Sequence, residues 1–239
     1  MPRQPSLLQP PIGFGHRGAR AHAPENTIES FELALRLGAT GLESDVWVTS
    51  DGVAVLDHDG VLRSGLRKKP ISSVRRDELP EHIPALAELY AAVGVEVPLS
   101  LDVKDPDAID ATIAAATAAG AVDGLWLCTP KWEDAAAWKE RWPDVKVVDS
   151  TRLSKMKDGP ERRGAQLAEA RVDAVNLHWT DWTAGMVALF HRFEIVAFGW
   201  DCQHRRQLDG LLDMGIDAVY SDHVDRMVDA LEGRPERPE

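Results

Sequence analysis

Three carboxylates in this chain have types and spacings that suit a metal site. Glu43 and Asp45 are two residues apart in LESDVW, and the two-residue period of a β-strand points both side chains the same way. Asp102 and Lys104 repeat this spacing in LDVKDP. Buried carboxylates are costly unless they are paired or bind a cation, and an all-oxygen set suits Mg²⁺ or Ca²⁺. We therefore predict a divalent-cation site; the alternative is three carboxylates on exposed strand tips.

Two histidines could supply proton transfer beside such an ion. His16 and His58 each follow an apolar run, so both are candidates for a general base and a general acid. Arg17 offers a planar fork for a phosphate, and Lys104 offers a second positive charge. With a cation, these groups would neutralise a phosphodiester and the charge that develops on it in the transition state. A structural role for each histidine is the alternative.

Short apolar runs alternate with helical patterns along the whole chain, and these elements must position the polar groups. The clearest helix is ENTIESFELALRLGA, in which we expect Asn26 to be the N-cap and Glu29 to reach back to it. The predicted strands are Ile12–His16, Gly41–Val48, Val53–Asp57, Pro98–Val103, Gly124–Cys128, Val145–Asp149, Ala174–His178, Ile195–Trp200 and Ala218–Ser221.

About eight strand–helix units fit in this length, because the Asp-Gly turn TSDG makes the second and third strands a hairpin. Eight units in 239 residues predict an α/β fold, a (β/α)8 TIM barrel, as one domain over residues 1–239 with frayed tails at 1–10 and 232–239. An open doubly wound sheet is the rival, but GHRGAR does not match the glycine-rich loop expected there.

The active site of such a barrel lies at the carboxyl ends of its strands. Most of the predicted strands deliver a polar or titratable group at that end, which core packing would not require. These groups are His16, Arg17, Glu43, Asp45, His58, Asp102, Lys104, Cys128, Asp149, His178, Trp200 and Asp201.

Composition narrows the classes of partner. A net charge of −12 disfavours nucleic acid and anionic membranes, so an anionic substrate needs a local cationic site. No apolar run is long enough for a membrane anchor, and MPRQPSLLQPPIGFG is a poor signal peptide. Two cysteines, Cys128 and Cys202, fit a reducing cytoplasm. The oligomeric state is not indicated.

The segment GHRGARAHAPENTIESFELALRLGATGLESDVWVTSDGVAVLDHD resembles the glycerophosphodiester phosphodiesterase family. The family pattern runs His-Arg-Gly, Pro-Glu-Asn-Thr, Glu-x-Asp-Val, Thr-x-Asp-Gly and His-Asp, and every element is present in order. IPALAEL, LSLDVKDP and GIDAVYSDHVDRMV are weaker echoes of later family motifs. The resemblance implies a metal-dependent hydrolase that releases glycerol 3-phosphate and an alcohol, with a place in glycerol and lipid metabolism.

Position by position, the resemblance makes His16 and His58 the catalytic pair, with His16 as base and His58 as acid. Glu43, Asp45 and Asp102 become the metal ligands, although the family usually has glutamate where Asp102 stands. The substrate-binding residues that it implies are Arg17, Glu25, Lys104 and Trp200. Glu25 would neighbour the metal or orient Arg17, or merely favour the helix N-terminus. Trp200 would stack on the glycerol carbons or pack in the core.

The family often inserts a small subdomain after His-Asp, whereas residues 60–82 here are expected to form only a basic loop. Such an insertion would leave an open pocket, and its arginines and lysines could steer anionic substrates. Two alternatives stay open: a related enzyme that acts on lysophospholipids or other phosphodiesters, and a non-catalytic barrel that binds a phosphorylated ligand. The nucleophile, water or the 2-hydroxyl of the substrate, is also open.

Overall fold

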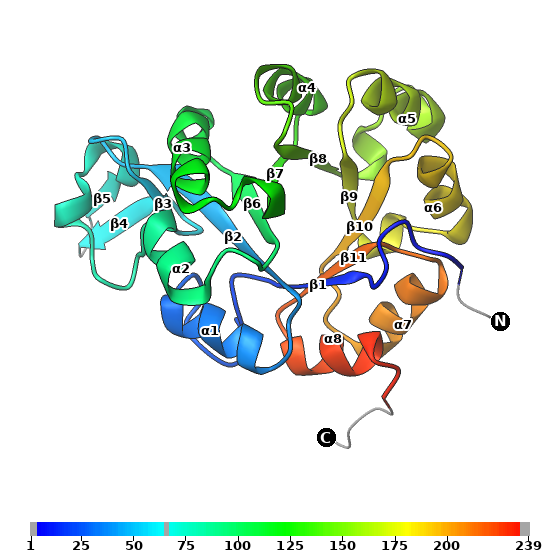
Figure 1. Cartoon of the computed structure of the whole chain (residues 1–239), viewed down its shortest axis with the longest axis horizontal. Coiled ribbons are helices and arrows are strands. Elements are labelled where there is room, and N and C mark those ends of the chain that lie inside the picture. The colour runs from blue at the N-terminus through cyan, green and yellow to red at the C-terminus, as the bar shows by residue number, and fades with distance from the viewer. Residues whose placement is uncertain (1–3, 65–66, 235–239) are drawn as a thin grey trace.

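The structure of the chain is a computed structural model that describes residues 4–64 and 67–234. Eight parallel strands close into a ring in which each strand pairs with the next and the last pairs with the first (Figure 1). Around the ring they are β1 (Ile12–Gly15), β2 (Gly41–Val48), β6 (Leu99–Val103), β7 (Leu125–Thr129), β8 (Lys146–Thr151), β9 (Ala174–His178), β10 (Val196–Trp200) and β11 (Ala218–Ser221). The predicted (β/α)8 barrel is confirmed.

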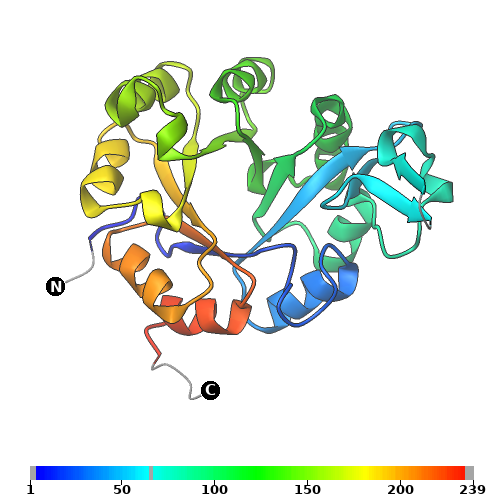
Figure 2. The same ribbon diagram turned by 180° about the vertical axis from the view of Figure 1, so that it is seen from behind.

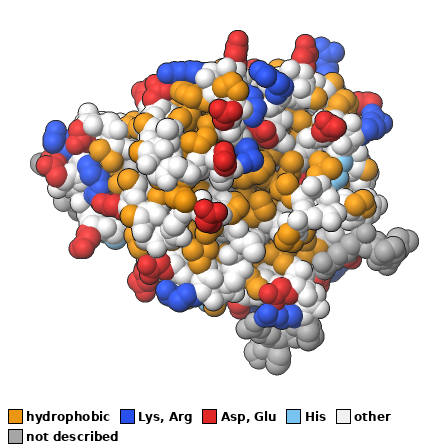
Figure 3. Space-filling view, viewed as in Figure 1, with side chains coloured by type: hydrophobic (Ala, Val, Ile, Leu, Met, Phe, Trp, Pro, Cys, Tyr) orange, Lys and Arg blue, Asp and Glu red, His pale blue; other side chains and the backbone are white. Residues whose placement is uncertain are grey.

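Helices surround the strands on the outside, as Figures 1 and 2 show from the two ends. They are α1 (Ile28–Arg36), α2 (Leu86–Val93), α3 (Ile109–Ala119), α4 (Trp132–Arg141), α5 (Gly159–Glu169), α6 (Ala184–His191), α7 (Arg205–Asp213) and α8 (Val224–Leu231). Among the described residues, no helix is long and apolar enough to cross a membrane. On the face seen in Figure 3, hydrophobic side chains gather toward the middle and most charged ones lie near the outline.

The barrel interior is filled by side chains and is not a pore. Phe14 stacks on Tyr220 with 4.8 Å between ring centroids, and Trp126 meets Phe198 edge-on at 5.0 Å. These residues come from β1, β7, β10 and β11, and together with Cys128, Val148, Ala174 and Ala218 they form one buried cluster inside the barrel. Tyr220 also lines the cavity described below, so this aromatic cluster closes the barrel beneath the site.

The loop between β1 and α1 turns tightly and differs from the predicted capping. Thr27 caps α1, because its side chain accepts a hydrogen bond from the Ser30 backbone N–H at 3.2 Å. The prediction that Asn26 is the cap is wrong, since Asn26 has a φ of +56° and its buried side chain turns toward β2 instead. Gly18 has a φ of +84°, and a Cβ there would meet Ser30 Oγ at 2.5 Å. A side chain at Gly18 would therefore separate this loop from α1.

The insertion after the hairpin is more than a loop. β3 (Ala54–Leu56) pairs antiparallel with β2, which confirms the predicted hairpin. Residues 60–82 then contain the antiparallel strands β4 (Val61–Ser64) and β5 (Arg67–Pro70) and two 3-10 turns, Ile71–Ser73 and Arg76–Glu78. Their apolar side chains form a small cluster of their own against Val55, so the prediction of a bare loop is wrong.

Several basic side chains of this insertion have local acidic partners. Arg63 pairs with Asp59 at 2.9 Å, and Arg76 pairs with Glu88 at 2.8 Å. Lys69 and Arg75 pair with carboxylates as well, while the side chain of Arg67 lies outside the described part of the structure. These pairs reduce the field available for steering an anionic substrate.

Asp217 fastens the N-terminal segment to the barrel end opposite the site. Its carboxylate is fully buried and accepts hydrogen bonds from Ser6 Oγ at 2.6 Å and from the Ala197 backbone N–H at 2.7 Å. The Leu7 backbone N–H and His191 also bond to it. Residues 1–3 and 235–239 of the predicted tails lie outside the described residues.

We expect Asp217→Asn to lower the free energy of unfolding by about 2–4 kcal/mol at neutral pH, because several donors lose a charged acceptor. Burial raises the pKa of Asp217, but hydrogen bonds from His191, Ala197 and Ser6 outweigh it, and the pKa lies below its usual value. The stability that Asp217 adds is thus present above the unfolded pKa and lost as the pH falls through the folded one. Urea unfolding of wild type, Asp217→Asn and the exposed control Glu169→Gln tests this; equal midpoints for all three would contradict it.

Candidate active site

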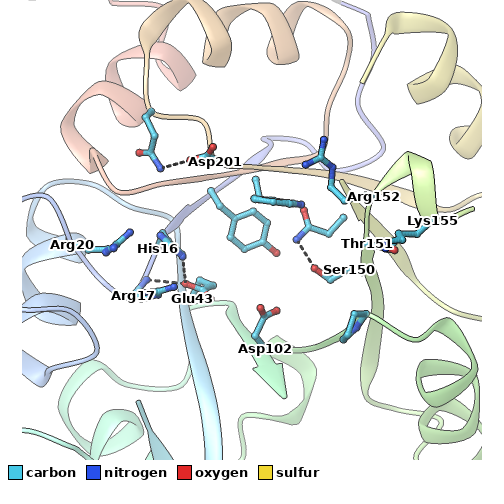
Figure 4. Close-up of a pocket in the computed structure, with 15 residues that line it drawn as sticks. His16, Arg17, Arg20, Glu43, Asp102, Ser150, Thr151, Arg152, Lys155 and Asp201 are labelled. Atoms are coloured by element: carbon cyan, nitrogen blue, oxygen red, sulfur yellow. Dashed lines mark hydrogen bonds and ion pairs between the residues drawn. The ribbon is translucent and has the colours of Figure 1, made fainter. Parts of the chain in front are cut away.

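A cavity of about 470 Å³ opens at the carboxyl ends of the barrel strands. In Figure 4, His16, Arg17, Arg20 and Glu43 lie on one side, Thr151, Arg152 and Lys155 on the other, and Asp102 between them. The lining residues are His16, Arg17, Arg20, Glu43, Asp102, Pro130, Ser150, Thr151, Arg152, Lys155, Asn176, Trp200, Asp201, Gln203 and Tyr220. Half of the predicted strand-end residues therefore line one cavity, namely His16, Arg17, Glu43, Asp102, Trp200 and Asp201.

The three predicted metal ligands converge. Glu43 and Asp45 project from β2 to the same side, and Asp102 on β6 stands directly opposite Asp45 in the strand register. Each of these three residues offers a carboxylate oxygen, and the three oxygens lie within 4.8 Å of one another. Glu43 is 5% exposed and Asp45 is 2% exposed. The donor set contains only oxygens, so it fits a hard divalent cation.

Asp45 is held by groups from two segments, the end of β6 and the loop between β1 and α1. Lys104 Nζ lies 3.0 Å from Asp45 and 3.0 Å from Asp102, so this lysine bridges two of the carboxylates. Arg17 Nε is 3.3 Å from Asp45, and Asn26 Nδ2 donates to it at 3.3 Å. Burial alone would lower the pKa of Lys104, but Asp102 and Asp45 outweigh it and raise the pKa. Lys104 is therefore a permanent cation in the site.

Glu43 is the least compensated carboxylate of the three. It accepts the Arg17 backbone N–H at 2.8 Å, for which Arg17 adopts a left-handed φ of +52°. Burial, opposed by His16 and assisted by Asp45 and Asp102, raises the pKa of Glu43 to about 7. A bound cation would stabilise a buried carboxylate that has so little positive charge around it. The residues present thus fit a divalent cation.

His16 stands between two carboxylates. Its Nδ1 meets Asp222 at 2.5 Å, and its Nε2 lies 3.8 Å from Glu43. Burial acts to lower the pKa of His16, but Glu43 and Asp222 outweigh it and the pKa is raised. Asp222 also fixes which ring nitrogen faces the cavity, as a carboxylate partner does for other catalytic imidazoles.

Glu25 forms ion pairs with two arginines of the loop between β1 and α1. Its carboxylate lies 3.0 Å from Arg17 Nη1 and 2.6 Å from Arg20 Nε. Arg20 also reaches Asp222 at 3.2 Å. Glu25 is not among the residues that line the cavity, so its position matches the orienting role that was one of the alternatives.

Of the predicted catalytic pair, His58 lies at the edge of the site and not in the cavity. It follows β3, is 41% exposed, and contacts Asp59 through Nδ1 at 3.0 Å. It is absent from the described lining of the cavity. Asp57, the residue before His58, donates its backbone N–H to the Asp45 carbonyl at 3.1 Å, so this part of the chain lies beside the strand that carries the metal ligands.

Other strand-end groups point elsewhere. Asp149 is fully buried and pairs with Arg163 of α5 at 2.6 Å, outside the barrel. Cys128 contacts Ser100 inside the barrel, and His178 pairs with Asp201 at 3.1 Å. Trp200 does line the cavity, where the His178 ring meets its indole edge-on at 4.6 Å between centroids.

Several residues at or beside the cavity have no role in the sequence-based prediction. Asp222 lies in YSDHVD, a motif that the resemblance covered without giving the residue a role. Asn176 and Ser150 face each other on β9 and β8 with 3.2 Å between Asn176 Nδ2 and Ser150 Oγ. Asn176 Oδ1 is buried and has no hydrogen-bond partner among the described residues, so it is an open acceptor. The polar run DSTRLSK at the end of β8, which includes Arg152 and Lys155, was a signal available in the sequence.

Carboxylates, a histidine and arginines gathered at the carboxyl ends of the strands are typical of the active site of a (β/α)8-barrel hydrolase. The profile of the Glycerophosphoryl diester phosphodiesterase family matches residues 16–226, and the chain belongs to that family.

Two known proteins are similar to this chain over nearly the whole length of both. A probable glycerophosphodiester phosphodiesterase 2 of Mycobacterium tuberculosis is 24% identical, over 94% of this chain and 92% of that protein. The crystal structure of a putative glycerophosphoryl diester phosphodiesterase of Silicibacter pomeroyi has a TM-score of 0.84 at 20% identity, over 99% and 97% of the two chains.

An Oleispira antarctica phosphodiesterase in complex with the product sn-glycerol-3-phosphate has a TM-score of 0.81 at 21% identity, over 93% and 97% of the chains. Identities this low show the fold alone. The chain spans only 8–37% of the length of several other curated relatives that it matches.

The pKa of Glu43 predicts how the metal-free protein responds to pH. Because its folded pKa of about 7 lies above the unfolded value, its stabilising contribution is full at acid pH and is lost as the pH rises through about 7. In chelator, we expect the free energy of unfolding of Glu43→Gln, relative to that of wild type, to increase on the order of 2 kcal/mol from about pH 5 to pH 8. Urea unfolding at these two pH values measures this gain. The same stability difference between variant and wild type at both pH values would contradict it.

Proposed function

We propose that the chain hydrolyses glycerophosphodiesters to glycerol 3-phosphate and an alcohol. The observation that carries this proposal is the meeting of Glu43, Asp45 and Asp102 with His16 and Arg17 at one mouth of the barrel. The sn-glycerol-3-phosphate in the Oleispira antarctica phosphodiesterase supports the same product class for this chain.

Glu43, Asp45 and Asp102 would hold one divalent cation, Mg²⁺ or Ca²⁺. When bound, this ion supplies positive charge to the phosphoryl group and lowers the pKa of an attacking hydroxyl. The charge balance supports a need for it. Around the metal-ligand group there are five carboxylates, Glu25, Glu43, Asp45, Asp102 and Asp222, and three permanent cations, Arg17, Arg20 and Lys104. The rest of the cavity lining adds the cations Arg152 and Lys155 and the carboxylate Asp201, so carboxylates stay in excess. A phosphodiester anion would otherwise meet a negative potential.

His16 would move the proton of the nucleophile. Its Nε2 faces the cavity while Asp222 holds Nδ1, so the imidazole can accept a proton without turning. The Asp222 carboxylate would stabilise the imidazolium that forms. We assign the leaving-group proton to His58, whose Nδ1 is engaged by Asp59 and whose position after β3 adjoins the ligand strand.

The remaining cavity residues would bind the substrate. Arg17 and Lys104 neutralise the phosphate oxygens, with Glu25 keeping Arg17 in place. Asn176 Oδ1 can accept a hydroxyl proton of the glycerol or of the leaving alcohol. Trp200 offers an apolar face to the carbon chain.

Cys128 and Cys202 are buried and form no disulfide in the described structure, which suits the cytoplasmic location inferred from sequence.

A panel of diesters tests the reaction. We expect glycerophosphocholine and glycerophosphoethanolamine to be hydrolysed with Mg²⁺ or Ca²⁺ and to be inert in chelator, because the carboxylates then repel the substrate. Phosphorus NMR of the products distinguishes glycerol 3-phosphate from a cyclic phosphate. Turnover of a lysophospholipid alone would favour the related phosphodiesterase. No turnover of any diester with any divalent ion would leave a phosphoryl-binding barrel.

Substitution of the two histidines tests the acid–base assignment. We expect His16→Ala and His58→Ala each to reduce kcat by about 10²–10⁴-fold with unchanged thermal unfolding. The matched control is His82→Ala, because His82 is an exposed histidine of the insertion and should leave kcat unchanged. Wild-type rates in His16→Ala would remove the assignment of the base, and wild-type rates in His58→Ala would remove that of the acid.

A further inference from the structure

A second group of potential metal ligands lies outside the carboxylate site. His22, His223 and Asp225 each offer one ligand atom, and these atoms lie within 4.8 Å of one another. His22 Nε2 is 3.1 Å from Asp225 Oδ1, and the two imidazole rings stand at 87° to each other with 6.2 Å between centroids. The sequence reasoning gave these histidines no role.

The three residues come from opposite ends of the chain and are already held side by side. His22 belongs to the loop after β1, whereas His223 and Asp225 stand at the start of α8. The Ala21 backbone N–H donates to the Asp222 carbonyl at 3.1 Å, and the His22 N–H donates to the Ala19 carbonyl at 2.8 Å. The His223 N–H donates to Ser221 Oγ at 3.1 Å. The backbone therefore presents the ligands before any ion arrives, which reduces the ordering cost of binding.

The donor atoms of this group differ in kind from those of the carboxylate site. Two imidazole nitrogens and one carboxylate oxygen suit Zn²⁺ and neighbouring transition metals, whereas three carboxylates suit Mg²⁺ or Ca²⁺. Ligands about 2.1 Å from a tetrahedral ion lie roughly 3.4 Å apart. The His22–Asp225 separation is close to this value, and a side-chain rotation of His223 would complete the set. His22 is 35% exposed and Asp225 is 31% exposed, so water can reach the fourth position.

We propose that His22, His223 and Asp225 form a transition-metal site, of the Zn²⁺ class, that clamps the loop after β1 to the start of α8. The clamp adjoins the catalytic residues without containing them. Asp222, next to His223, contacts both His16 and Arg20, which lie on the clamped loop. An ion at the clamp would therefore stabilise the contact between the loop that carries His16 and the segment that carries Asp222.

Metal binding tests the clamp without measuring activity. Equilibrium dialysis against Zn²⁺, with Mg²⁺ in excess to fill the carboxylate site, is compared for wild type, His22→Ala, Asp225→Asn, His82→Ala and Asp45→Asn. We expect one Zn²⁺ per chain in wild type, in the His82→Ala control and in Asp45→Asn. Loss of one ligand should weaken binding by more than about 100-fold in His22→Ala and Asp225→Asn, since outer-shell partners alone contribute 10–100-fold.

Two further readouts use the same proteins. Co²⁺ should give the visible absorption of a tetrahedral nitrogen–oxygen site in wild type and not in His22→Ala. Zn²⁺ should raise the Tm of wild type and of His82→Ala, but not the Tm of His22→Ala or Asp225→Asn. Unchanged Zn²⁺ affinity in His22→Ala, or loss of Zn²⁺ in Asp45→Asn alone, would overturn the proposal. Neither result depends on the hydrolysis of a diester, so the failure of one proposal is distinguishable from the failure of the other.

Discussion

Two carboxylates buried on one strand, Glu43 and Asp45, impose the main constraint on this molecule. An unpaired buried charge costs several kcal/mol, so the surrounding structure must supply positive charge and hydrogen bonds. Lys104, Arg17 and Asn26 converge on Asp45, whereas Glu43 receives mainly a backbone N–H. The incomplete compensation at Glu43 is a cost to the folded protein that a divalent cation would remove, and it connects stability with the proposed chemistry.

The barrel makes this arrangement possible by register and by loops. Parallel pairing sets Asp102 opposite Asp45, so three ligands need only two adjacent strands. The loop after β1 then bends back over them, because Gly18 and the left-handed Arg17 and Asn26 let it approach α1 and β2 closely. Asp222, between the last strand and the last helix, then contacts His16 from the other end of the chain. Residues from the first and last tenth of the chain thus meet beside one cavity.

Most of the fold was predictable, because strands buried on both faces and helices with one apolar face leave strong periodic patterns. The period of two also predicted that Glu43 and Asp45 share a side. Contacts that depend on loop conformation were not predictable. Asn26 has the residue type and spacing of an N-cap, yet its positive φ turns the side chain to Asp45. Asp149 lies near the end of its strand as Asp102 does, but its carboxylate pairs with Arg163 on a helix, which the spacing along β8 does not reveal.

The central claim is that Glu43, Asp45 and Asp102 enclose one divalent cation. Crystals soaked in Mn²⁺ and measured at its absorption edge test this claim most directly. The account predicts an anomalous peak at bonding distance from all three carboxylates, with Lys104 displaced from at least one of them. A well-ordered site without a peak there, with Lys104 still bridging Asp45 and Asp102, would contradict it.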